Sequence, residues 1–156
     1  MERQALIQAM KRSISEVLET MFFLSVEFSD MTVAGDLPYS EKDRIAATRL
    51  NFSGPFSGSF VLFIPEEFAV ALAANFLGKD KESSSSKNVT ETSKEIINMI
   101  AGNTFAILDD QAVFDLNIPE KIHFEEALHS SGSADEVVVR SNTMDNYFVL
   151  KVAISR

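Results

Sequence analysis

The sequence of 156 residues contains no cysteine and few basic residues. Without cysteine the chain can form no disulfide, no zinc–thiolate site and no thiol nucleophile, which suits the cytosol. Only 14 Lys and Arg stand against 23 Asp and Glu, which gives a net charge of −9. Nucleic-acid binding needs clustered Lys and Arg, so the composition argues against that class of partner.

Long apolar runs and familiar catalytic motifs are missing too. No run reaches membrane-spanning length, and the opening MERQALIQAMKR lacks a signal-peptide core, so we expect a soluble, cytoplasmic protein with no membrane partner. There is no Gly-rich phosphate loop, G-x-S-x-G or H-E-x-x-H. His123 and His129 are a weak metal signal, and we interpret them as surface or strand-filling residues.

The most informative stretch that is present covers residues 88–110, NVTETSKEIINMIAGNTFAILDD. Asn88, followed three residues later by Glu91, predicts an N-cap with its capping-box partner, so we expect a helix to begin there. Apolar residues then recur at helical spacing and predict one buried stripe, which consists of Ile96, Ile97, Ile100, Thr104, Ile107 and Leu108.

The opposite face of this predicted helix is unusual. At about 100° per residue, four residues align outward and two apolar residues flank them: Glu95, Asn98, Gly102 and Ala106, with Met99 and Phe105 beside them. A mid-helix glycine costs about 1 kcal/mol relative to alanine but lets another surface approach the backbone. We interpret this face as a docking surface for a second protein. The alternative is that Glu95 closes a capping box with Thr92 and Asn98 is merely solvated.

The rest of the chain predicts one domain, residues 1–156, of ordinary globular composition. Its hairpin-like connections indicate the α+β class, with a largely antiparallel sheet and helices packed on it. We expect helices at 2–24 and 65–77, a loop at 35–42 and a linker at 78–88. The expected strands are 25–33, 44–52, 58–64, 112–118, 136–140 and 147–154, and residues 121–129 are either a strand or irregular.

Two short matches indicate an internal repeat. Residues 16–19 (EVLE) match 95–98 (EIIN) at an offset of 79, and residues 60–62 (FVL) match 148–150 (FVL) at an offset of 88. Together they predict two degenerate helix–strand repeats. The first copy has Glu19 where the second has Asn98, and we interpret Glu16 and Glu19 as solvated carboxylates. The run MFFL at 21–24 is either buried all round or meets another subunit.

The run 95–103, EIINMIAGN, resembles the E-x-x-N signature of the CheC/CheX/FliY chemotaxis phosphatases. Pro119 lies near the position of that motif's proline. Glu91 departs from the pattern, since the family often has Asp or Ser four positions before the glutamate. With a single E-x-x-N helix and this length, the chain is most similar to the CheX members.

The resemblance implies a CheC-like fold, a homodimer built by strand exchange, and dephosphorylation of the phosphoaspartate of a CheY-like response regulator. Asn98 would position the attacking water and Glu95 would pair with a lysine of the regulator. Mg²⁺ would belong to the regulator, so the chain would need no metal or cofactor of its own. These roles suit the chemistry of the residues, because an amide can hold a water in line with phosphorus and a carboxylate can grip a lysine.

Two other functions stay open at this stage. The first is a non-catalytic CheC-like scaffold or flagellar-switch component that binds a response regulator through the same helix face. The second is an unrelated α+β ligand-binding domain, which would have a concave pocket away from residues 95–106. Neither the identity of the regulator nor the choice between chemotaxis and another two-component circuit follows from the sequence.

Overall fold

A computed structural model describes residues 2–31, 44–77, 86–129 and 135–155 of the chain. Four helices and seven strands follow one another along these residues. In chain order they are α1 (Arg3–Phe22), β1 (Glu27–Met31), β2 (Ile45–Ser53), β3 (Ser57–Pro65), α2 (Glu66–Leu77), α3 (Ser86–Leu108), β4 (Asp115–Leu116), β5 (Glu120–Ile122), α4 (Phe124–His129), β6 (Glu136–Asn142) and β7 (Tyr147–Ser155).

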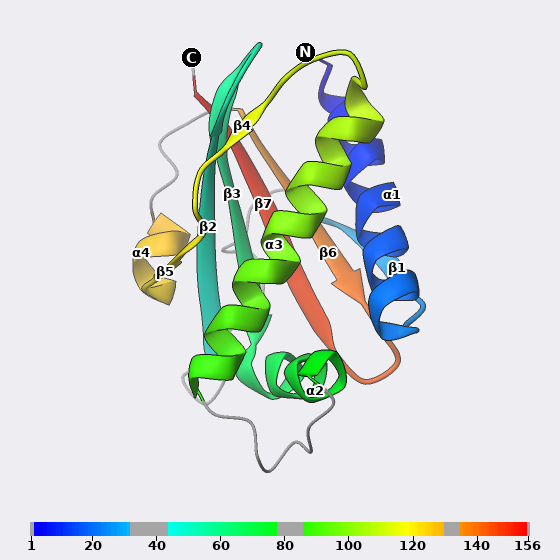
Figure 1. The fold of residues 1–156 in the computed structure, drawn as a ribbon, viewed down its shortest axis with the longest axis vertical. Helices are drawn as coiled ribbons and strands as arrows, with labels where there is room; N and C mark the ends of the chain where they lie inside the picture. Colours follow the sequence, from blue (N-terminus) through cyan, green and yellow to red (C-terminus); the bar gives the residue numbers. More distant parts are fainter. Residues whose placement is uncertain (1, 32–43, 78–85, 130–134, 156) are drawn as a thin grey trace.

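All the strands join one sheet in the order β1-β6-β7-β3-β2-β4, with β5 paired to β2 beside β4. Every pair is antiparallel. Helices α1 and α3 lie side by side across one face of the sheet, and α2 crosses below them (Figure 1). The short α4 contributes Ala127 to the apolar cluster on the other face. The predicted α+β class and antiparallel sheet are therefore confirmed.

The larger core lies between the sheet and the three long helices. Side chains alternate along β3, so that Leu62 faces α1 and α3 while Val61 and Phe63 face α4. Because α1 and α3 each bury one stripe on the same sheet, their other faces are left outward. Among the described residues, no helix is both long enough and apolar enough to cross a membrane.

The predicted repeat is visible in the sheet. In the second repeat, β4 with β5 takes the place of β1, β6 that of β2, and β7 that of β3. When these strands are exchanged, the strand order of the sheet is the same from either edge. Leu62 pairs directly with Leu150 across β3 and β7, and these are the residues that the offset of 88 maps onto each other. A pseudo-twofold axis therefore passes between them.

The helices obey the same symmetry. Buried residues of α1 have buried counterparts 79 positions later in α3: Met10, Ser13, Ile14, Val17, Leu18 and Phe22 correspond to Val89, Thr92, Ser93, Ile96, Ile97 and Ala101. Exposed positions also agree, because Glu16 and Glu19 correspond to the exposed Glu95 and Asn98. The two repeats thus place two related helices in equivalent positions on the sheet.

Several predicted boundaries need correction. Helix α3 begins at Ser86, so Asn88 is inside the helix and the capping box from Asn88 to Glu91 is wrong. Residues 112–118 form ladder hydrogen bonds only at Asp115–Leu116, although burial alternates as in a strand from 112 to 117. Residues 121–129 divide between β5 and α4. The predicted loop at 35–42, the end of the strand at 32–33 and most of the linker, 78–85, lie outside the described residues.

The MFFL run is not buried all round. Phe22 is buried and Leu24 is half-buried, whereas Met21 is 39% exposed and Phe23 is 85% exposed. Helix α1 ends here because Phe23 adopts a left-handed conformation with φ of 57°, and Leu24 donates its backbone N–H to the Leu18 carbonyl. The second option, contact with another subunit, stays open.

Candidate functional site

Two buried hydroxyl groups donate hydrogen bonds to one carbonyl oxygen in the middle of α3. Ser13 of α1 donates a hydrogen bond of 2.8 Å to the carbonyl oxygen of Ile100, and Thr104 donates one of 2.7 Å to the same oxygen. Both hydroxyl-bearing residues are fully buried. A buried hydrogen bond between helices restrains their relative position, so the α3 segment around Ile100 is a firm platform.

Glu95 and Asn98 stand on the outward side of this platform. Both are exposed and lie one helical turn apart, as predicted. Neither side chain forms a hydrogen bond or ion pair with the part of the chain that the structure describes. Thr92 lies well inside α3 and is only 3% exposed, so the alternative of a capping box between Thr92 and Glu95 is wrong.

The predicted Gly/Ala strip continues from Asn98 along the same helix. Ala106 is exposed, while Gly102 and the flanking Met99 are half-buried. Phe105 does not flank the outward face as expected, because it is only 4% exposed. It continues the buried row Ile97, Ala101 and Phe105 at a spacing of four residues, and its ring stacks on Phe114 with centroids 3.9 Å apart.

Two other residues that entered the comparison with the motif are Glu91 and Pro119. Glu91 is exposed and approaches Lys94 at 3.9 Å, an i,i+3 ion pair that leaves Glu95 and Asn98 untouched. Pro119 is half-buried between β4 and β5. His123 is exposed, and the described residues contain no group of three His, Cys, Asp or Glu arranged to hold a metal ion.

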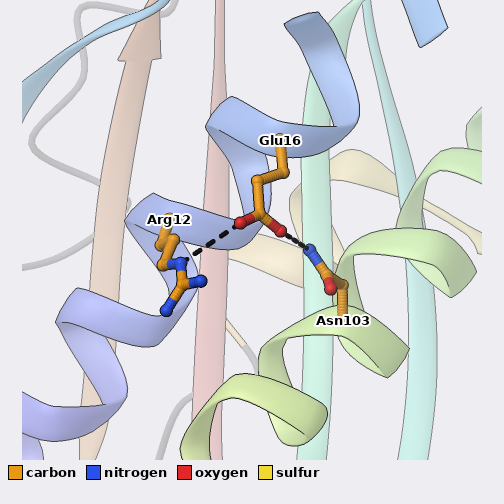
Figure 2. A network of polar contacts seen from close by, with 3 residues as sticks. All are labelled: Arg12, Glu16 and Asn103. Carbon is orange, nitrogen blue, oxygen red and sulfur yellow. Dashed lines mark hydrogen bonds and ion pairs between the residues drawn. The ribbon is translucent and has the colours of Figure 1, made fainter. Parts of the chain in front are cut away.

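Helix α1 contributes a polar network that the sequence reading missed. Figure 2 shows Glu16 between two donors: Asn103 donates from Nδ2 to Oε2 at 2.9 Å, and Arg12 donates from Nε to Oε1 at 3.1 Å. The Asn103 hydrogen bond, followed by that of Arg12, lowers the pKa of Glu16 below its ordinary value of 4.5. The interpretation of Glu16 as merely solvated is therefore wrong. The i,i+4 spacing of Arg12 and Glu16 was readable in the sequence; the contact with Asn103 was not.

A hollow also exists away from the outward face of α3. It measures about 400 Å³ and lies between the N-terminal half of α3, the start of α2 and β5, with Thr48, Ser93 and Lys121 among its lining residues. The ligand-binding hypothesis expects such a hollow, so the pocket does not by itself decide between the functions. Comparison with known proteins bears on the fold and the family of the chain.

The fold matches solved structures over nearly the whole chain. A chain of the CheX–CheY–BeF3–Mg²⁺ complex from Borrelia burgdorferi is similar, with a TM-score of 0.77 and 22% identity, over 97% of this chain and 98% of that one. A CheC-like superfamily protein from Shewanella sp. PV-4 gives 0.75 and 18% identity, over 100% of both chains. The chemotaxis protein CheX from Vibrio vulnificus gives 0.74 and 17% identity, over 96% of both. These likenesses establish the CheC-like fold.

The family follows from the sequence comparison. A search of curated proteins gives no match. The family model described as chemotaxis phosphatase CheX matches residues 46–141, which include the whole of α3 with Glu95 and Asn98. That match covers well over half of the chain. The chain therefore belongs to the chemotaxis phosphatase CheX family, and its enzyme class is that of a phosphatase.

Proposed function

We propose that this chain dephosphorylates the phosphoaspartate of a CheY-like response regulator that docks on α3. One observation carries the proposal: Glu95 and Asn98 are exposed and unpaired within the described chain, one turn apart on a helix whose centre is held by buried hydrogen bonds. A structurally similar chain was crystallised in a CheX–CheY–BeF3–Mg²⁺ complex, which supports the same class of partner here.

The two side chains divide the chemistry between binding and hydrolysis. The Asn98 amide accepts a hydrogen bond from a water and holds it in line with the phosphorus. The water oxygen forms a bond to phosphorus while the bond from phosphorus to the aspartate oxygen breaks, which releases inorganic phosphate and the aspartate carboxylate. Glu95 pairs with a lysine of the regulator and so fixes the register of docking. The Mg²⁺ arrives with the phosphorylated regulator as part of the substrate.

The test compares phosphate release from a phosphorylated CheY-like regulator in the presence of wild type and Asn98→Ala. Removing the water-positioning amide should slow hydrolysis at least about 100-fold, because misplacing a reacting water costs this much. Binding to the beryllofluoride-activated regulator should change little. Asn51→Ala is the matched control, since Asn51 is an exposed asparagine on β2 whose neighbours Leu50 and Phe52 face the helices, so that its own side chain points to the other face of the sheet.

Two results would count against this function. If Asn98→Ala keeps near wild-type activity, Asn98 does not position the water. If the wild-type protein binds the regulator but releases no phosphate, the chain acts as the non-catalytic interaction module, despite its membership of a phosphatase family.

We also propose that the chain forms a homodimer. Exposed Met21 and Phe23 at the end of α1 support it, since large apolar side chains in water favour burial against another surface. The family resemblance implies that the two subunits exchange strands, and these would be strands of the sheet described above. A monomer by light scattering at micromolar concentration would remove this part of the proposal and leave the catalytic part intact.

A further inference from the structure

Beyond Asn98, the outward face of α3 runs into a groove of about 250 Å³. One wall is α3 itself, with Gly102 and Ala106, and the other wall is the segment after the helix, with Phe114 and Leu116. The groove begins one turn past Asn98, about 6 Å along the helix axis. A protein that reaches Asn98 therefore also covers the groove.

Among the described residues, no close contact explains why position 102 is a glycine. A Cβ atom built there would meet only Leu116 Cδ1, at 3.9 Å, which is ordinary van der Waals contact. Gly58 differs, because a Cβ there would collide with the carbonyl oxygen of Ala153. Alanine would fit at position 102 and would favour the helix. The glycine therefore keeps space free for a group that comes from outside.

The lining of the groove indicates the chemistry of that group. Apolar side chains make up most of the lining, among them the stacked rings of Phe105 and Phe114. The open end carries the exposed carboxylates Asp109 and Asp110, just past the C-terminal end of α3, where the helix dipole adds further negative potential. Among the described residues, no Lys or Arg lines the groove. An apolar side chain with a neighbouring cation fits both features.

We infer that the groove receives an apolar side chain of the docked response regulator, and that an adjoining Lys or Arg of the regulator pairs with Asp109 and Asp110. This inference rests on the proposed function, since it specifies what the same docking surface recognises. The groove provides affinity and register, whereas Glu95 and Asn98 act at the phosphoryl group.

The first test fills the groove without touching the catalytic pair. Gly102→Ala should raise the thermal midpoint by about 2 to 4 °C, because alanine favours the helix. It should also weaken binding to a CheY-like regulator loaded with beryllofluoride and Mg²⁺ by about tenfold, as expected for a filled contact pocket. KM for the phosphorylated regulator should rise, while kcat stays near wild type. Ala106→Arg should weaken binding further.

The second test removes the acidic end. Asp109→Asn with Asp110→Asn should weaken binding several-fold at low salt, and the difference from wild type should shrink at about 0.5 M salt. The matched control is Glu125→Gln with Asp145→Asn, which removes the same charge from two exposed residues outside α3 and the groove. The control should bind like wild type.

The outcomes separate this inference from the function on which it rests. Wild-type affinity in Gly102→Ala, combined with loss of hydrolysis in Asn98→Ala, overturns the groove and leaves the phosphatase proposal standing. Equal weakening by the acidic pair and by its control overturns the cationic partner. A wild-type chain that neither binds nor dephosphorylates the regulator overturns both proposals.

Discussion

Helices α1 and α3 share one design and differ at the positions that matter for chemistry. Each buries one stripe on the sheet and turns an E-x-x-polar pair outward. In α3 the pair is Glu95 and Asn98, and neither side chain is hydrogen-bonded or ion-paired to the described residues. In α1 the equivalent pair is Glu16 and Glu19, and Glu16 already accepts hydrogen bonds from Asn103 and Arg12.

A third difference concerns access. The offset of 79 aligns Phe23, the residue just past the C-terminal end of α1, with Gly102 inside α3. Phe23 projects into solvent with 85% exposure, where α3 has no side chain at all. The two repeats thus place two similar helices on the sheet, with an exposed phenylalanine just past the end of one and a glycine at the aligned position of the other. Under the proposed mechanism, an outward carboxylate on such a helix is insufficient, because it must also be unpaired, followed by an amide and left accessible.

The largest expected effect comes from exchanging the two polar pairs. In a variant with Asn98→Glu and Glu19→Asn, the E-x-x-N sequence moves from α3 to α1. We expect phosphatase activity to fall at least about 100-fold, because α3 loses its water-positioning amide. The new amide on α1 should not restore it, since Glu16 is already paired and Phe23 obstructs the approach.

The single variant Glu19→Asn is the control for this exchange and should keep wild-type activity. Phosphate release is measured for both variants with the same phosphorylated regulator. Recovery of activity in the double variant would show that α1 can replace α3, so that the two helices would be equivalent in function.

An intermediate effect is expected where α1 supports α3. Ser13→Ala removes the hydrogen bond to the Ile100 carbonyl, but Thr104 still donates to that oxygen, so no acceptor is left unsatisfied. The free energy of unfolding should therefore fall by only about 0.5 to 1 kcal/mol in denaturant titrations. Ser15 lies two residues further along the same helix and on a different face of it. Ser15→Ala should therefore cause no loss of stability, because alanine is the better helix former.

A larger loss than this for Ser13→Ala, of several kcal/mol, would mean that the serine holds the two helices together more strongly than one shared hydrogen bond can. A loss in Ser15→Ala equal to that in Ser13→Ala would remove the claim that the buried hydroxyl matters. In both variants Asn98 stays outward, and phosphate release at saturating regulator should stay near wild type.

Periodicity explains why most of the fold was predictable. The hairpin of β2 and β3, the helix α3 and the last two strands all carry repeating apolar positions long enough to read. Helix α4 has only six residues, too few for a helical period to appear. Phe105 was placed outward because the buried row below it includes Ala101, a residue too small to mark a core position in sequence.

Only part of the site was predictable from the sequence. The outward positions of Glu95, Asn98 and Ala106 follow from helix geometry alone. The pairing of Glu16 with Asn103 joins residues 87 positions apart, so only the packing of α1 on α3 reveals it. The groove beside Gly102 has the same origin, because it exists only where the segment after α3 folds back along the helix.

The smallest expected effect concerns the ionisation of Glu16. Hydrogen bonds from Asn103 and then Arg12 stabilise its charged form, so its pKa in the folded protein lies below 4.5. A carboxyl group with a lowered pKa contributes stability above its unfolded pKa, and this contribution is lost as pH falls through the folded value. The carboxylate is exposed, so the effect on unfolding should be slight and appear only in acid.

An NMR titration of the Glu16 carboxyl measures this directly. Its pKa should lie below 4.5 in wild type and move back towards that value in Asn103→Ala, which removes the largest single cause, and also in Arg12→Gln. Glu16→Gln should keep wild-type phosphatase activity, because this carboxylate is engaged within the chain. A wild-type pKa at or above 4.5 would mean that Asn103 and Arg12 do not hold the Glu16 carboxylate in its charged form. The second of the three differences between α1 and α3 would then disappear, and only the missing amide and the obstructing Phe23 would separate the two helices.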